Sequence, residues 1–243
     1  MKVMVFEDKK QLSLYAADLI EKQINSKNDS KICFATGATP ELTYQYLIEK
    51  YKNNKLSFKD VISFNLDEYV NLDKNNKCSY NYYMFSNLFN HIDIKKQNIN
   101  LPESLGDANQ NAQNYNTKVI QSGGIDFMIL GIGTNGHIAF NEPGSQIDQF
   151  TRVVDLTQST IDSNKIYFED ESQVPKQAIS MGLANILQAK KIILLAYGKN
   201  KSEAIYQAIN QPISAACPAS FLQLHPNVTF LVDKEAISKI IKY

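Results

Sequence analysis

The sequence predicts a single α/β domain, in which a mainly parallel, doubly wound sheet carries helices on both faces, as in Rossmann-like folds. Short apolar runs rich in β-branched and aromatic residues recur along the 243 residues, and stretches with helical periodicity follow most of them. This alternation is typical of a parallel sheet covered on both faces. No internal repeat, low-complexity tract or Pro/Gly/Ser-rich linker divides the chain, so residues 1–243 are expected to form one domain.

The expected strands are, in chain order, KVMVF, ICFA, VISFN, DFMILGI, KIILLAY and VTFLV. Each run is bounded by polar or turn-forming residues, as strands usually are. The stretch 8–25 illustrates the expected helices, because its apolar residues lie largely on one helical face: Leu12, Leu14, Ala16, Ala17, Leu19 and Ile20. In folds of this class, ligands bind beyond the carboxyl ends of the strands, so motifs that follow strands are the best candidates for a functional site.

Composition and charge exclude several classes of partner. The 25 basic and 25 acidic side chains cancel, whereas nucleic acids and anionic membranes attract a concentrated basic face. Cys33, Cys78 and Cys217 form neither a CxxC pair nor a metal-ligand spacing, which indicates reduced thiols in a cytoplasmic protein. The N-terminal segment lacks the apolar stretch of a signal peptide, and no window is apolar over the roughly 18–20 residues that span a bilayer.

The first motif after a strand is ATGATP. It predicts a turn formed by Thr36, Gly37 and Ala38, with Thr39 as the N-cap of the next helix and proline in its first position. Backbone N–H groups and the positive end of the helix dipole would then face the turn, as in a phosphate site that lacks the lysine of a P-loop. A capped turn that binds nothing explains the same residues about equally well.

The second motif, SFNLDEYVNL, places Asp67 directly after an apolar strand. A carboxylate there would emerge at the mouth of the sheet, and its apolar neighbours Leu66, Tyr69 and Val70 would partly desolvate it. Desolvation raises the pKa of a carboxyl group, as suits a general base. Taken alone, this motif is more often a helix-capping or loop acid on a solvated surface.

The third motif is GIGTNGHIAFNE, which follows the apolar run FMIL. Its glycines permit a bend and a close approach of the backbone to a ligand. His137 and Glu142 form a pair in which the carboxylate can orient the imidazole for proton transfer. A lone histidine beside Ile-Ala-Phe is more often a core residue, but the glycines and the following Asn-Glu-Pro-Gly favour a functional role.

The sequence lacks the motifs of metal sites, serine nucleophiles and dinucleotide sites. His137 and Glu142 offer only two metal ligands, and no HxH, HExxH or cysteine motif completes a site. No GxSxG elbow provides a serine nucleophile, and the glycines do not fit a dinucleotide fingerprint with its acidic ribose partner. The sequence therefore indicates neither a metal nor a cofactor.

Six segments in a fixed order resemble one known family, the glucosamine-6-phosphate deaminases, also called glucosamine-6-phosphate isomerases. They are ATGATP, SFNLDEYVNL, GIGTNGHIAFNEPGS, QVPKQAISMG, GKNK and SFLQLHP, and they span nearly the whole chain. The resemblance implies an enzyme of amino-sugar metabolism that isomerises and deaminates glucosamine 6-phosphate. Its products would be fructose 6-phosphate and ammonia, formed by acid–base catalysis.

The resemblance also implies roles for individual residues. Asp67 looks like the base that moves a proton between C2 and C1, and His137 like the acid–base of ring opening, with Glu142 as its partner. Where the family often carries aspartate this chain has Asn135, which can orient His137 by hydrogen bonding but cannot carry charge.

The phosphate-binding elements of the family resemble the turn from Thr36 to Thr39 together with Lys201. Lys165 lies near the position of a family arginine and would hold phosphate as a point charge. Residues at about 155–174 match a mobile lid that excludes water from the sugar.

Two alternatives come from other functional classes. A 6-phosphogluconolactonase-like hydrolase shares the fold and a glycine-rich GH motif, but its block usually continues toward Ser-Leu-Phe-Pro, where this chain has FNEP. A non-catalytic sugar-phosphate sensor would need the phosphate cradle but not the three acid–base residues together.

Oligomeric state is a separate expectation. Many longer family members are hexamers activated by N-acetylglucosamine 6-phosphate, and they carry a lysine where this chain has Val154 followed by Asp155. An apolar residue beside a carboxylate cannot hold that phosphate. This departure from the hexameric members predicts a monomer or small homo-oligomer without this activation.

Overall fold

The computed structural model describes residues 1–164, 168 and 174–241. Within these residues a seven-stranded parallel sheet has the order β1-β10-β9-β6-β2-β3-β5. The α/β class expected from the sequence is confirmed. The strands are β1 (Lys2–Phe6), β2 (Lys31–Phe34), β3 (Ile62–Asn65), β5 (Ile99–Asn100), β6 (Phe127–Leu130), β9 (Ile192–Ala196) and β10 (Val228–Asp233).

All six apolar runs expected to be strands lie in this sheet. The central strands β6 and β9 are buried at every position, as expected when helices cover both faces of a parallel sheet. The short edge strand β5 was not predicted, because two residues carry no detectable apolar pattern.

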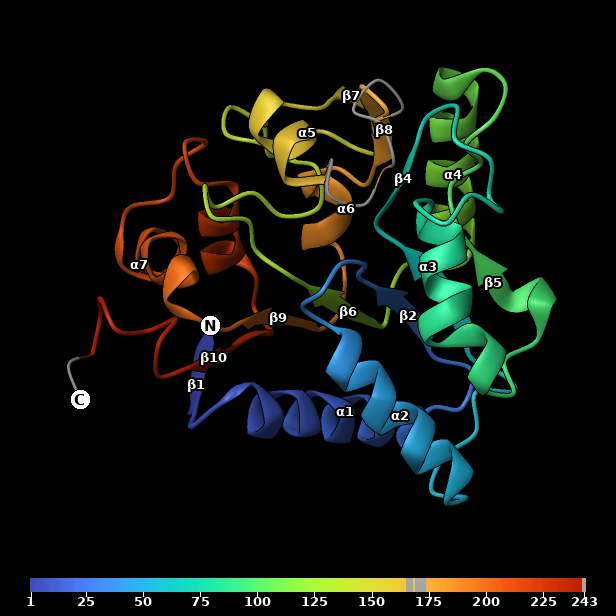
Figure 1. The fold of residues 1–243 in the computed structure, drawn as a ribbon, viewed down its shortest axis with the longest axis horizontal. Helices are drawn as coiled ribbons and strands as arrows, with labels where there is room; N and C mark the ends of the chain where they lie inside the picture. Colours follow the sequence, from blue (N-terminus) through green and yellow to red (C-terminus); the bar gives the residue numbers. More distant parts are fainter. Residues whose placement is uncertain (165–167, 169–173, 242–243) are drawn as a thin grey trace.

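Helices lie on both sides of the sheet (Figure 1). Helices α1 (Lys9–Ser26) and α2 (Glu41–Lys52) lie together below the strands in this view, and α1 begins where Asp8 accepts the N–H of Gln11. Leu12, Ala16 and Ile20 on α1 are fully buried, which confirms most of the apolar face predicted from the sequence. Leu14 is exposed and Leu19 only partly buried, so the buried face is narrower than predicted. The other helices are α3 (Tyr80–Asn87), α4 (Ala108–Gln121), α5 (Gln158–Asn164), α6 (Leu183–Leu187), α7 (Ser202–Asn210), and the 3-10 helices η1 (Phe89–His91), η2 (Lys96–Asn98), η5 (Lys199–Lys201) and η6 (Pro218–Leu224).

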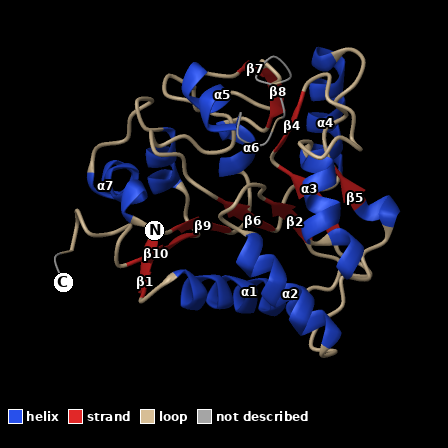
Figure 2. Ribbon diagram, in the orientation of Figure 1, coloured by secondary structure: helices blue, strands red, loops and turns tan. Residues whose placement is uncertain are grey.

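A second, three-stranded antiparallel sheet lies above the main sheet (Figure 2). Its order is β4-β8-β7, formed by β4 (Asp67–Tyr69), β8 (Gln177–Ser180) and β7 (Arg152–Asp155). An aromatic cluster packs against it, in which the rings of Tyr80 and Phe140 stack and Tyr69 contacts both. The sequence did not predict this sheet, which carries Asp67 at the start of β4.

The strand order reverses direction between β2 and β6. From β2 the chain proceeds outward to β3 and β5, whereas from β6 it proceeds the other way to β9 and β10. The connections that leave β2 and β6 therefore diverge, and a crevice opens between them at the carboxyl ends of the strands. The first and third sequence motifs are these two connections, so the topology brings them together.

Part of the expected lid at 155–174 falls outside the described residues, namely 165–167 and 169–173, and Lys165 lies there. The described part includes the end of β7 and helix α5. Among the helices that the structure describes, none is long and apolar enough to cross a membrane.

Candidate active site

A cleft of about 420 Å³ opens at the reversal of strand order. Its walls come from the connections after β2 and β6, from β4, from α5 and from the turn before α7. Of the residues predicted to form a site, those that line the cleft are Thr36, Gly37, Thr39, Asp67, Asn135, His137 and Lys201. Segments far apart in the sequence thus meet in one cavity.

The connection after β2 bends at Gly37, whose φ of 85° is unfavourable for residues with a side chain. The hydroxyl of Tyr83 donates to the Gly37 carbonyl at 2.7 Å, and that of Tyr197 donates to the Ala38 carbonyl at 3.0 Å. These bonds hold the turn from outside. Ala38 itself is exposed and is not among the residues that line the cleft.

The expected N-cap at Thr39 is wrong. Helix α2 begins at Glu41, with Pro40 in the capping position and no side-chain cap, because the proline continues the turn with helical φ and ψ. The Thr39 side chain faces the end of β6 instead, where a Cβ added to Gly131 would lie 3.8 Å from Thr39 Oγ1. Thr39 therefore lines the cleft, and its hydroxyl does not cap helix α2.

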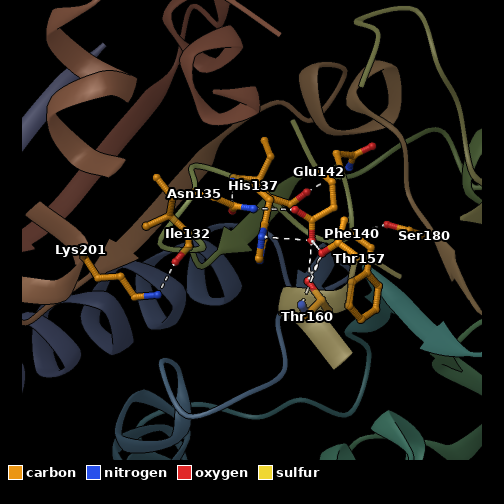
Figure 3. Close-up of polar contacts among 11 residues, drawn as sticks. Ile132, Asn135, His137, Phe140, Glu142, Thr157, Thr160, Ser180 and Lys201 are labelled. Atoms are coloured by element: carbon orange, nitrogen blue, oxygen red, sulfur yellow. Dashed lines mark hydrogen bonds and ion pairs between the residues drawn. The ribbon is translucent and has the colours of Figure 1, made fainter. Parts of the chain in front are cut away.

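Lys201, the last residue of η5, lines the same cleft. Its ammonium donates to the Ile132 carbonyl at 2.7 Å (Figure 3), and burial lowers the pKa of this amine. No carboxylate forms an ion pair with it among the described residues. A partly buried cation without a counter-ion favours an anionic ligand, which would offset the cost of its desolvation.

Asp67 is held in the cleft wall by the pairing of β4 with β8, in which it lies opposite Ser180. Its side chain is nearly buried, with 6% of its surface exposed. Burial, with a smaller contribution from the neighbouring charge of Glu68, raises the pKa of Asp67 to about 8. The desolvation predicted from the apolar neighbours is therefore confirmed.

Glu68 points away from the cleft and holds the start of α3. Its carboxylate accepts the N–H groups of Tyr69, Tyr80 and Asn81 at 2.7–3.0 Å. Burial nevertheless raises the pKa of Glu68 to about 7, because its desolvation outweighs these bonds. The clamp places Tyr80 in the cleft wall, a contribution that the sequence did not reveal.

The glycines of the third motif make room for two side chains. A Cβ on Gly133 would lie 2.3 Å from Cε1 of His137, so the imidazole lies directly over this glycine. A Cβ on Gly136, whose φ is 84°, would lie 2.5 Å from Cys217 Sγ. The spacing of these glycines follows from the packing of His137 and Cys217.

His137 and Glu142 approach each other as the sequence predicted. The imidazole Nδ1 lies 3.4 Å from Glu142 Oε1, a separation that suits an ion pair. Asn135 bridges the two residues, since its side-chain N–H donates to Glu142 Oε2 at 2.7 Å and its side-chain carbonyl accepts the backbone N–H of His137 at 3.2 Å. Figure 3 shows the three side chains pointing toward one another.

Two threonines complete the surroundings of Glu142 and were missed by the sequence reasoning. The hydroxyls of Thr160 and Thr157 donate to Glu142 Oε1 at 2.6 and 3.3 Å. Burial of this carboxylate raises its pKa, but the bonds and charge supplied by His137, Thr160 and Asn135 outweigh burial and lower the pKa of Glu142 to about 2. Glu142 is thus a firmly ionised carboxylate behind His137.

A metal site is not formed by the described residues, because no group of three or more His, Cys, Asp or Glu side chains could hold an ion there. The site therefore offers a desolvated carboxyl group, a histidine–carboxylate pair and, beside a polar turn, an ammonium group that has no ion-pair partner among the described residues. This set can transfer protons on a small anionic molecule.

Comparison with known proteins places the chain among relatives of the same length. A sequence profile of the family described as glucosamine-6-phosphate isomerases/6-phosphogluconolactonase matches residues 7–231. Glucosamine-6-phosphate deaminase of Mycoplasma mycoides is 51% identical over 99% of this chain and 98% of its own length. The enzyme of the same name from Thermoanaerobacter pseudethanolicus is 47% identical over 99% of this chain and 95% of its own.

Solved structures give the same result. A monomeric glucosamine-6-phosphate deaminase superposes with a TM-score of 0.95 at 41% identity, covering 98% of this chain and 99% of the other. The 6-phosphogluconolactonase of Trypanosoma brucei superposes with a TM-score of 0.81 at 21% identity, covering 99% and 98%, which shows a common fold alone. The resemblance inferred from the six sequence segments is confirmed: the chain belongs to the glucosamine-6-phosphate isomerase/6-phosphogluconolactonase family.

Proposed function

We propose that the protein is a glucosamine-6-phosphate deaminase, which converts glucosamine 6-phosphate and water to fructose 6-phosphate and ammonia. The observation that carries the proposal is the desolvated carboxyl group of Asp67 in the same cleft as Lys201 and the His137–Glu142 pair. The names of the full-length relatives support the same substrate.

The substrate would lie across the cleft with its phosphate at one end. The Thr36–Thr39 turn offers hydroxyl and backbone N–H donors. Among the described residues that line the cleft, Lys201 is the one cation, and its ammonium donates to a backbone carbonyl. The carbon chain would then extend toward Asp67 and His137. Within the described part of the chain, Asp67 is the carboxyl group that lines the cleft directly.

Ring opening would come first and involve His137. An imidazole beside an ionised carboxylate can move a proton between the ring oxygen and the anomeric hydroxyl, which gives the open-chain aldose. Glu142 would hold the imidazole and stabilise it when protonated, and Asn135 would fix the Glu142 carboxylate and the backbone at His137 through its side-chain amide. Asn135 fills the orienting role without adding charge.

Isomerisation would follow at Asp67. The ionised carboxylate removes the proton from C2, the electron pair of that C–H bond forms the C1=C2 double bond, and the carbonyl oxygen at C1 takes up a proton. Return of a proton to C1 leaves an imine at C2. Water adds to this imine and ammonia leaves, so one water molecule is consumed and one ammonia is released for each fructose 6-phosphate.

This sequence of steps suits a carboxyl group of high pKa. A carboxylate in water is a weak base toward carbon, whereas the burial that raises the pKa of Asp67 to about 8 strengthens it as a proton acceptor. The reaction is an isomerising deamination, in which the hydrolytic step acts on an imine. We further propose that the protein works in the cytoplasm as a monomer or small homo-oligomer.

Ammonia release from glucosamine 6-phosphate is the test. We expect release coupled to equal formation of fructose 6-phosphate, with glucosamine lacking the phosphate as a poor substrate. Hydrolysis of 6-phosphogluconolactone without ammonia release would assign the protein to the lactonases. Binding of either sugar phosphate without turnover would identify a sensor. The mass in solution, measured by light scattering, tests the oligomeric state.

A further inference from the structure

Thr160 on helix α5 and Thr157, the residue just before this helix, contact the acid–base pair, although neither has a role in the steps described above. Thr160 is nearly buried, with 7% of its surface exposed, and it lines the cleft. Its hydroxyl lies 2.6 Å from Glu142 Oε1, and Thr157 Oγ1 lies 3.3 Å from the same oxygen. Figure 3 shows both threonines on the side of Glu142 that faces His137.

The two oxygens of Glu142 have different partners. Oε2 accepts the amide of Asn135, whereas Oε1 faces His137 Nδ1 and receives the threonine hydroxyls. The oxygen that pairs with the imidazole is therefore the one that α5 holds. A rotation of the Glu142 carboxylate about its Cγ–Cδ bond would break the contact of Oε1 with Thr160 and its contact with His137 at once.

The two hydroxyls also form a chain. Thr157 Oγ1 lies 3.1 Å from Thr160 Oγ1 and 3.3 Å from Glu142 Oε1, and its single hydrogen can go to only one of them at a time. When it goes to Thr160, Thr157 donates to Thr160 while Thr160 donates to Glu142. A donor that is itself a hydrogen-bond acceptor is polarised, which strengthens the bond it gives. This arrangement directs the hydroxyl of Thr160 toward the carboxylate.

The positive charge that can face Glu142 comes from His137. His137, in the connection after β6, is the titratable group that faces this carboxylate within the described residues. Arg152 on β7 lies nearby but donates to Asn141 and Ser145. Helix α5 thus contributes neutral hydroxyl donors at Glu142, and no charge.

We propose that Thr160, supported by Thr157, is a positioning residue that fixes Glu142 Oε1 against His137. The inference rests on the proposed function and extends it to helix α5, because the conformation of α5 then sets the geometry of the acid–base pair. The hydrogen bond from Thr160 also lowers the pKa of Glu142.

Isosteric substitution separates this role from packing. Thr160→Val keeps the shape and removes the donor, Thr160→Ser keeps the donor, and Thr157→Val removes the weaker partner. Thr151→Val is the matched control, since Thr151 is equally buried and donates at 3.1 Å to the neutral side chain of Asn185, away from Glu142.

We expect Thr160→Val to lower kcat for glucosamine 6-phosphate roughly 10- to 100-fold, the range for a lost hydrogen bond to a charged group, with KM changed less than about threefold. Thr157→Val should lose less, and Thr160→Ser and Thr151→Val should remain close to the parent enzyme. Equal losses in Thr160→Val and Thr151→Val, or no rescue by serine, would overturn the proposal.

A second measurement needs no substrate. The ¹³C resonance of the Glu142 carboxyl group, assigned by its absence from Glu142→Gln, reports the pKa of that group in the free protein. In Thr160→Val this pKa should rise by about one unit, and in Thr151→Val it should stay unchanged. An unchanged titration in Thr160→Val rejects the proposal even if kcat falls.

The two measurements also separate failure of this inference from failure of the proposed function. Should the parent enzyme release no ammonia from glucosamine 6-phosphate, the proposed function fails, and the carboxyl titration still decides whether Thr160 holds Glu142. The rate profile against pH is a poorer test, because the higher pKa of Asp67 dominates its acidic limb.

Discussion

Asp67 and Glu142 are carboxylates of one site in opposite surroundings. Asp67 lines the cleft, is nearly buried and accepts no hydrogen bond at its carboxyl group from the residues that the structure describes, and its pKa is raised to about 8. Glu142 lies behind His137, receives bonds from Asn135, Thr157 and Thr160, and has a pKa lowered to about 2. The separation between these pKa values comes from burial at Asp67 and, at Glu142, from the bond and charge of His137 together with the other hydrogen bonds, which outweigh burial.

Such a separation divides proton chemistry between two groups of the same type. A carboxyl group whose charge is poorly solvated takes a proton readily, whereas one whose charge is held by several donors remains an anion and orients its neighbour. The contrast therefore predicts a base at Asp67 and a fixed anion at Glu142. The predictions below test each side of it.

The largest effect is expected for Asp67→Asn. The amide keeps the shape but cannot accept the C2 proton, so kcat should fall by roughly 10²–10⁴-fold, the contribution typical of a positioned base. Binding of fructose 6-phosphate, measured by calorimetry, should be nearly retained. Asp155→Asn, at an exposed position on β7, is the control. Substantial turnover in Asp67→Asn would remove this residue from the mechanism.

Glu142→Gln should cost less, because its lost charge acts through His137. We expect kcat to fall roughly 10- to 100-fold. His137→Gln combined with Glu142→Gln should lose little more than the worse single variant, since groups that act as a unit are not additive. Losses that add in a double-mutant cycle of kcat would show that Glu142 has only a structural role.

Lys201→Ala tests the anion end of the cleft, away from both carboxylates. Loss of one charge-assisted contact to phosphate should raise KM for glucosamine 6-phosphate roughly tenfold, with a smaller fall in kcat. Lys199→Ala is the matched control, because Lys199 lies in the same 3-10 turn and is exposed. An unchanged KM in Lys201→Ala would move the phosphate elsewhere.

The smallest effect concerns stability. The pKa of Asp67 is about 8 in the folded protein and near 4 in an unfolded chain. As pH rises from about 4 to 8, the unfolded chain therefore releases this proton before the folded one, and the free energy of unfolding decreases.

Asp67→Asn removes this loss. The melting temperature of the variant should exceed that of the parent by roughly 5–10 °C near pH 8.5 and by much less near pH 4.5. The pKa of Glu68 is raised by its own burial in both proteins, so its contribution cancels from the difference except for its coupling to Asp67. A difference in melting temperature that does not depend on pH would show that Asp67 titrates normally.

Most of the main sheet could be predicted because its strands are buried on both faces and read as continuous apolar runs, as in FMIL and IILLA. The small sheet could not. Its strand RVVD is only partly buried, and β4 has three residues of which two are acidic, so no apolar pattern marks either as a strand. Pairing with β8 makes them strands.

The site divides in a similar way. Asp67, His137 and Glu142 follow apolar runs and carry groups that transfer protons. Their residue types and their positions after strands therefore identify them as candidates from the sequence. Thr160 has no such mark, because its role depends on a contact with a residue 18 positions earlier in the chain. The capping position predicted at Thr39 was wrong because Pro40 adopts helical φ and ψ and takes the capping position itself, without a side-chain cap.

The order of the strands has a consequence for how the protein folds. The turn after β2 and the connection after β6 are almost a hundred residues apart in the chain, and they meet only when β2 pairs with β6. Contacts of such long sequence separation close late and slow folding, because the intervening loop must lose its entropy first. A chain released before residue 127 can therefore form neither half of the cleft completely, and a bound sugar phosphate would select only molecules whose central strands have already joined.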